Sequence, residues 1–156
     1  MKRVSMVAVG VMVVVSSYAT SVLAETPQEV TGSIVFSQQP DGAGKTCVIP
    51  VKTGKTNMSD TDCKNDTVSY FQLNNVPSAV VFTLNSEKDC AVSDWYFTMR
   101  TIVHPTTTIW LSIPSLKIRQ DNEIIVKGLR MERNFYDHGN IEGKLSCVDV
   151  VRSEEP

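Results

Sequence analysis

The chain has 156 residues, of which 42% are hydrophobic and 21% charged, and its formal net charge is −2. This length is typical of one domain with a core of its own. The slightly acidic balance, without a basic run, argues against nucleic acid and anionic membranes as partners, and it is compatible with a cation, a sugar or a protein.

Residues 1–24 have the three parts of a secretory signal peptide: a positive end, an apolar core over residues 4–15 and Val22-Leu23-Ala24 as the cleavage site. The apolar core is shorter than the roughly 20 residues of a membrane-spanning helix, which disfavours a retained anchor. We predict cleavage before Glu25, export to the periplasm or out of the cell, and no membrane attachment after cleavage. The mature chain, residues 25–156, is expected to be a single β-sandwich domain.

The mature part contains four cysteines: Cys47, Cys63, Cys90 and Cys147. An exported chain meets an oxidising compartment, so an even number of cysteines predicts two disulfides. Zinc is disfavoured because no C-x-x-C spacing is present. Four cysteines allow three pairings, which the sequence leaves open. As a working assignment we take Cys47–Cys63 as a local bridge and Cys90–Cys147 as a long-range one.

Helical periodicity is nearly absent after the signal, and short runs of β-branched and aromatic residues alternate with turn residues. Residues 52–64 and 85–94 are expected to be loops, and Leu129–Tyr136 fits either a strand or a helical turn. The pattern predicts an all-β fold, a two-sheet sandwich or Greek-key barrel of about eight or nine short strands, with a division into two halves between residues 73 and 79. The expected strands are residues 32–37, 45–51, 67–73, 79–84, 95–103, 106–113, 116–118, 123–127 and 144–151.

The sequence does not have the pattern of an enzyme. Its two histidines are His104 and His138, no G-x-S-x-G motif is present, and disulfides would consume the four thiols. We therefore predict a non-enzymatic protein. A secreted hydrolase with His104 or His138 as its base is an alternative, because the members of a catalytic triad need only meet in space.

The stretch Asn65-Asp66-Thr67-Val68-Ser69 ends the segment richest in side-chain oxygens, the ligands that calcium prefers. It resembles the calcium motif of βγ-crystallin domains, in which two Asn or Asp residues are followed by two variable residues and Ser or Thr. The resemblance implies a sandwich of two Greek-key motifs and a calcium ion bound by Asn65, Asp66 and Ser69. The alternative is a solvated loop with Asx-turns and no metal.

Aromatic side chains suggest a different kind of site. Trp95, Tyr96 and Trp110 could form a platform for a sugar or a peptide. In a strand, Trp95 and Phe97 share one face and Tyr96 points to the other. Since one of these faces must be core, packing is the alternative interpretation.

Together these features favour an exported, non-enzymatic binding protein without a cofactor, with a protein or a cell-surface component as its partner. An inhibitor, an immunity-type protein or a secreted effector would each fit. The alternatives are a calcium-stabilised, βγ-crystallin-like structural domain and a secreted hydrolase.

Overall fold

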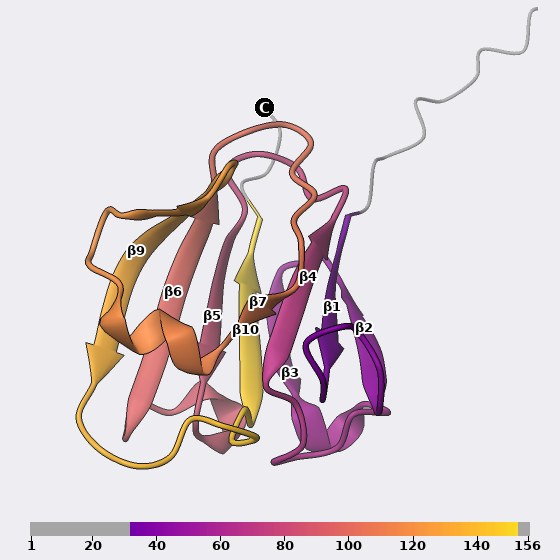
Figure 1. Cartoon of the computed structure of the whole chain (residues 1–156), viewed down its shortest axis with the longest axis vertical. Helices are drawn as coiled ribbons and strands as arrows, with labels where there is room; N and C mark the ends of the chain where they lie inside the picture. The colour runs from indigo at the N-terminus through magenta and orange to yellow at the C-terminus, as the bar shows by residue number, and fades with distance from the viewer. Residues whose placement is uncertain (1–31, 153–156) are drawn as a thin grey trace, which may run out of the picture.

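The computed structural model describes residues 32–152, which form a sandwich of two antiparallel β-sheets (Figure 1). The predicted signal peptide lies outside the described residues. The prediction of an all-β, two-sheet fold with two disulfides is confirmed, with ten strands instead of eight or nine. In chain order the strands are β1 (Ser33–Ser37), β2 (Thr46–Pro50), β3 (Gly54–Asn57), β4 (Tyr70–Asn74), β5 (Val81–Asn85), β6 (Trp95–Thr101), β7 (Leu111–Ser112), β8 (Ile124–Val126), β9 (Leu129–Tyr136) and β10 (Cys147–Val151).

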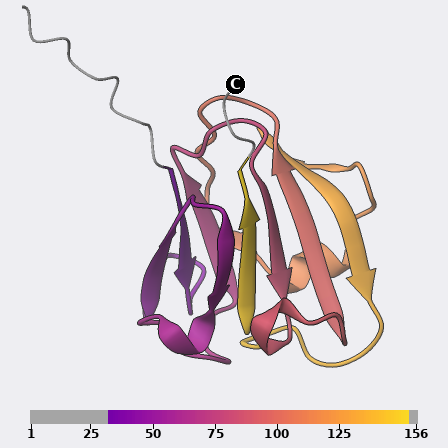
Figure 2. The same cartoon turned by 180° about the vertical axis from the view of Figure 1, so that it is seen from behind.

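The described residues also contain three short 3-10 helices, η1 (Met58–Asp60), η2 (Lys88–Cys90) and η3 (Pro114–Ile118). η3 lies on the same side of the larger sheet as the smaller sheet does, in front of it in Figure 1 and behind it in Figure 2. It buries Leu116 and contacts β9. η3 therefore covers the part of the larger sheet that the smaller sheet leaves open. No helix among residues 32–152 is long and apolar enough to cross a membrane.

The core lies between the two sheets. The smaller sheet has the strand order β2-β1-β4-β7, and the larger sheet has the order β3-β10-β5-β6-β9-β8. In β6 every second residue is buried, from Trp95 to Thr101, so one face of the strand points inward. Phe71 of β4 meets Phe82 of β5 edge to face, with ring centroids 6.0 Å apart. Aromatic packing thus joins the two sheets.

Both disulfides lie at the end of the sandwich where β1 ends and where β4 and β10 begin. Cys47–Cys63 links β2 to the segment after η1, and Cys90–Cys147 links η2 to the first residue of β10. This pairing agrees with the working assignment from the sequence. Each bridge limits the freedom of the unfolded chain, and the one that closes the longer loop is expected to stabilise the fold more.

The chain folds as two matching halves that exchange one strand each. The first half contributes β1, β2 and β4 to the smaller sheet and β3 to the larger one. The second half contributes β5, β6 and β10 to the larger sheet and β7 to the smaller one, with the β8–β9 hairpin as an addition. β1 pairs with β4 in the same five-residue antiparallel register in which β5 pairs with β10. Because each half completes the sheet of the other, neither sheet is made by one half alone.

One expected loop contains a strand. Within residues 52–64, predicted to be loop, Gly54–Asn57 forms β3 and Met58–Asp60 forms η1. β3 has no alternating apolar residues, so its sequence carries no strand signal. It is a strand because its backbone pairs with β10, from Asn57 opposite Cys147 to Gly54 opposite Val150.

Two further segments differ from the predicted strands, and in a third the structure decides between two predicted alternatives. Of the strand expected over residues 106–113, only Leu111–Ser112 is a strand. In the segment before it, the hydroxyls of Thr107 and Thr108 accept hydrogen bonds from the backbone N–H groups of Asn75 and Leu73. Residues 116–118, expected to be a short strand, belong to η3, which starts with Pro114. Leu129–Tyr136, which fitted a strand or a helical turn, is a strand of eight residues.

Candidate functional site: an apolar loop and two polar hollows

The loop between β6 and β7, residues 102–110, exposes aliphatic side chains at one end of the sandwich, at the top of Figure 1. Ile109 is 71% exposed, Ile102 is 42% exposed and Val103 is 41% exposed. The segment contains no Asp, Glu, Lys or Arg. We call it the apolar loop. The loop thus exposes three aliphatic side chains without a charged neighbour in its own sequence, and covering such side chains with a partner is favourable.

Threonine residues hold the apolar loop against β4 and the residues that follow it. Thr106 forms a backbone bridge with Val76, with hydrogen bonds of 2.9 and 2.7 Å, and its hydroxyl donates to the Val103 carbonyl at 2.7 Å. The Thr108 hydroxyl accepts a hydrogen bond from the buried backbone N–H of Leu73 at 3.0 Å. The loop is therefore fixed by inward-pointing polar groups while its aliphatic side chains point outward.

The adjoining β8–β9 turn also fits closely against this loop. The Ile102 backbone N–H donates to the Gly128 carbonyl at 2.9 Å. Gly128 has a φ of +90°, and a Cβ at this position would lie 2.9 Å from the Thr106 hydroxyl oxygen. Only glycine suits both the backbone conformation and this close approach. The contact ties the apolar loop to the larger sheet as well as to the smaller one.

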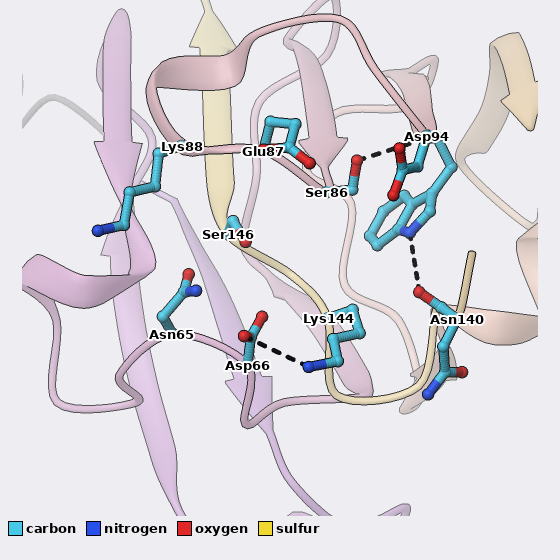
Figure 3. A pocket seen from close by; sticks show the side chains of 10 residues that line it. Asn65, Asp66, Ser86, Glu87, Lys88, Asp94, Asn140, Lys144 and Ser146 are labelled. Carbon is cyan, nitrogen blue, oxygen red and sulfur yellow. Dashed lines mark hydrogen bonds and ion pairs between the residues drawn. The ribbon is translucent and has the colours of Figure 1, made fainter. Parts of the chain in front are cut away.

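Two polar hollows lie at the opposite end of the sandwich, beside the disulfides. One, of about 390 Å³, is lined by Ser146 together with the loop after β5, and the other, of about 470 Å³, by Ser69 together with the loop after β1. We call them the Ser146 hollow and the Ser69 hollow. Lys144 and Asp66 line both. Carboxylates outnumber ammonium groups in the Ser146 hollow, with Asp66, Glu87 and Asp94 against Lys88 and Lys144 (Figure 3).

The two serines occupy matching places in the two halves. Each is buried and directly precedes a strand, Ser69 before β4 and Ser146 before β10. The Ser69 N–H donates to the carbonyl of Ser37, the last residue of β1, and the Ser146 N–H donates to the carbonyl of Asn85, the last residue of β5. The two hollows are thus counterparts under the internal repeat, each built where the halves meet.

The structure separates the three predicted calcium ligands. Asn65 lines the Ser146 hollow, Ser69 lines the other hollow, and Asp66 lies between them. The Asn65 side-chain oxygen is buried and has no hydrogen-bond partner among the described residues, which would suit a cation. Against this, the Lys144 ammonium lies 3.4 Å from the Asp66 carboxylate, and the Ser69 hydroxyl accepts from the Gly143 N–H at 2.9 Å. Within residues 32–152 no three His, Cys, Asp or Glu side chains are grouped to hold a metal ion.

The two histidines proposed as a catalytic base lie at opposite ends of the sandwich, His104 in the apolar loop and His138 in the turn after β9. His138 lies between two carboxylates, 2.8 Å from Asp137 through Nδ1 and 3.3 Å from Asp94 through Nε2. The hydrogen bond to Asp137 and then the charge of Asp94 raise the pKa of His138 above its usual value. The nearby Ser93 hydroxyl donates to Asp94 and not to the histidine. Both ring nitrogens of His138 thus face carboxylates, and the Ser93 hydroxyl is bonded to Asp94.

The aromatic residues predicted as a platform lie apart. Trp95 is fully buried, stacks on Phe97 and donates from its ring N–H to the Asn140 carbonyl, so it is part of the core beneath the Ser146 hollow and not an exposed platform. Tyr96 points to the outer face of the larger sheet and stacks on Phe135. Trp110 precedes β7 of the smaller sheet. The three side chains therefore form no common surface.

Residues 106–108 are the sequence feature that marks the apolar loop. Three consecutive threonines read as β-branched strand formers, yet their hydroxyls also bind backbone groups of neighbouring segments. An uncharged run of aliphatic residues around such threonines could have indicated an ordered, exposed loop. Comparisons with known protein families, curated proteins and solved structures find no match to this chain.

Proposed function

We propose that this chain is an exported, non-enzymatic binding protein that contacts a protein partner through the apolar loop. The observation that carries the proposal is the exposure of Ile102, Val103 and Ile109 on a backbone held by Thr106 and Thr108. Two disulfides in a small β domain are consistent with export. Cleavage after Ala24 belongs to the same proposal.

The fixed backbone of the apolar loop matters for affinity. Ordering a mobile loop on binding costs free energy, and a loop already held in one conformation avoids most of that cost. Loops on a rigid scaffold are a common place for binding residues. The bonds from Thr106 to Val76 and from Thr108 to Leu73 hold the loop against the end of β4 and the residues after it before any partner arrives.

The chemistry of the loop favours a protein over a sugar or a charged surface. Its exposed side chains are mainly aliphatic, and residues 102–110 carry no formal charge. Sugars are typically bound by exposed aromatic faces; of the two tryptophans of the predicted platform, Trp95 is buried and Trp110, the last residue of the apolar loop, is partly buried. Aliphatic and aromatic groups at the centre of an interface, with few charges, are typical of protein–protein contacts.

The test compares two exposed aliphatic residues at opposite ends of the molecule. Ile109 is 71% exposed in the apolar loop, and Val92 is 73% exposed in the loop after η2. The oxidised domain is used to capture proteins from extracts of the producing cells and their surroundings. The affinity of each captured protein is then measured by calorimetry with the wild type, Ile109→Ser and Val92→Ser.

We expect Ile109→Ser to weaken binding at least tenfold, about 1.4 kcal/mol, because a central apolar contact is lost. Val92→Ser is expected to change affinity less than twofold, and neither variant should change the unfolding midpoint by more than a degree or so, since both side chains are exposed. Equal affinities of the two variants for every captured protein would contradict the proposal.

A second candidate is a βγ-crystallin-like structural domain. The observation that favours it is the internal repeat, in which the paired strands β1–β4 and β5–β10 share one register and each half contributes a strand to the sheet of the other. Such a domain would have no partner that depends on the apolar loop. The capture experiment therefore distinguishes the two candidates.

A further inference from the structure

The internal repeat allows the two loops at the hollow end to be compared residue by residue. Ser69 and Ser146 are equivalent because their backbone groups make the same hydrogen bonds in the two halves. Their carbonyls also match, since the Ser69 carbonyl accepts from Ile113 after β7 and the Ser146 carbonyl from Met58 after β3, both at 2.8 Å. Counting back from the serines, Lys144 of the second half takes the place of Thr67 in the first.

This replacement puts an ammonium group where the two halves meet. The Lys144 Nζ lies 3.4 Å from a carboxylate oxygen of Asp66, which belongs to the loop of the other half (Figure 3). Lys144 and Asp66 both line the two hollows. The pair therefore links the loop before β10 to the loop before β4 by charge, at the point shared by the hollows.

We infer that the Lys144 ammonium takes the place of a metal cation between these two loops. An ion pair between the two halves thus replaces the calcium site implied by the motif at residues 65–69. The inference is independent of binding by the apolar loop. It rests on the position of Lys144 in the repeat and on its contact with Asp66.

The contacts of the predicted calcium ligands are consistent with an ion pair made by Lys144 in place of a metal ion. Calcium needs six to eight oxygen ligands at 2.3–2.6 Å, and an ion bound to Asp66 would be repelled by the ammonium group that already lies beside this carboxylate. The Ser69 hydroxyl accepts from Gly143, so it too joins the two loops. Among the predicted ligands only the Asn65 oxygen is without a partner in the described residues, and one neutral oxygen does not outweigh a resident positive charge.

The first test measures thermal unfolding of the oxidised wild-type domain, freed of metal, with a chelator and with millimolar calcium at constant ionic strength. We expect the two midpoints to agree within about 1 °C. A ligand that binds only the folded state, at about 100 times its dissociation constant, would raise the midpoint by several degrees. A rise of that size would overturn the inference.

The second test removes the ion pair between Lys144 and Asp66. Lys144→Gln is compared with Lys88→Gln, because Lys88 lines the Ser146 hollow but points away from Asp66 (Figure 3). Lys144→Gln should lower the midpoint by about 1–4 °C, as expected for one exposed ion pair, and Lys88→Gln should have less effect. In an Asp66→Asn background the loss caused by Lys144→Gln should disappear. Equal midpoints for the two lysine variants, or an undiminished loss without Asp66, would overturn the inference.

Discussion

At the end of the sandwich that carries the apolar loop, threonine hydroxyls point inward to hold the backbone, and Ile102, Val103 and Ile109 point outward. At the opposite end both disulfides and a cross-half ion pair hold the loops, and polar side chains line the exposed hollows. Both ends are therefore fixed, by different means. They differ most in what they present to solvent.

That difference bears on where a partner is expected. A partner that covers the apolar loop releases water from aliphatic surface, which is the main source of affinity in protein association. A partner at the hollows would have to replace the hydration of several charged groups, which costs free energy unless each is paired again. The hollow end thus suits contacts that hold the two halves together, and the apolar loop is the surface that we propose for binding.

The largest expected effect on stability comes from removing the disulfides at the hollow end. Replacing Cys90 and Cys147 with Ala should lower the free energy of unfolding by about 4 kcal/mol, and replacing Cys47 and Cys63 by about 3 kcal/mol, because the bridged residues are 57 and 16 positions apart. Guanidinium unfolding of the oxidised variants measures both losses. A greater loss of unfolding free energy on removal of Cys47–Cys63 would show that loop length does not set the contribution of these disulfides to stability.

An intermediate effect is expected from the hydrogen bonds of the apolar loop. Thr108→Val leaves the buried Leu73 N–H without its acceptor and should cost about 1–3 kcal/mol of unfolding free energy. The neighbouring Thr107→Val, whose hydroxyl accepts from Asn75 at an exposed position, is the matched control and should cost about 0.5 kcal/mol or less. Urea unfolding compares them. Similar losses for both would mean that the Thr108 bond does not hold the loop.

The smallest effect is a pH dependence at the hollow end. Because Asp137 and Asp94 raise the pKa of His138, its contribution to stability is fully present below the unfolded-state pKa of about 6.5 and is lost as the pH rises through the higher folded-state pKa. His138 is exposed, so the decline in the unfolding midpoint should be slight. His138→Gln should flatten this dependence of the unfolding midpoint on pH. His104→Gln, in the apolar loop, should leave the dependence unchanged.

An NMR titration of the two histidines checks the origin of this dependence directly. The ring protons of His138 should titrate at a higher pH than a model histidine does, and Asp137→Asn should move the midpoint down, because Asp137 makes the largest contribution to the raised pKa. An unchanged His138 titration in Asp137→Asn would contradict the assignment.

Much of the fold could be predicted because the core strands carry their own pattern. In β6 the alternation from Trp95 to Thr101 fixes which face is buried, and four cysteines in an exported chain indicate two disulfides. β3 could not be predicted, because Gly54–Asn57 is a strand only through pairing with β10. The threonines at 106–108 misled the prediction, since their side chains bond to other segments instead of continuing a strand.

The sites were harder to predict than the strands because they depend on contacts between distant residues. Lys144 gives no sign in the sequence that it meets Asp66. The division into two halves could be predicted, but the residue-by-residue correspondence between them is hidden because the β8–β9 hairpin lengthens the second half and because the matching positions hold unlike residues. Trp95 was a plausible binding aromatic on composition alone, and only the packing of β6 shows it to be core.

The most direct test of binding by the apolar loop is photocrosslinking in the setting where the protein acts. A photoreactive amino acid replaces Ile109 in one variant and Val92 in another, two positions of nearly equal exposure at opposite ends of the sandwich. Each variant is irradiated in the culture of the producing cells, and adducts are resolved by mass. We predict a discrete protein adduct from position 109 and none from position 92. An adduct formed from position 92 alone would contradict the account.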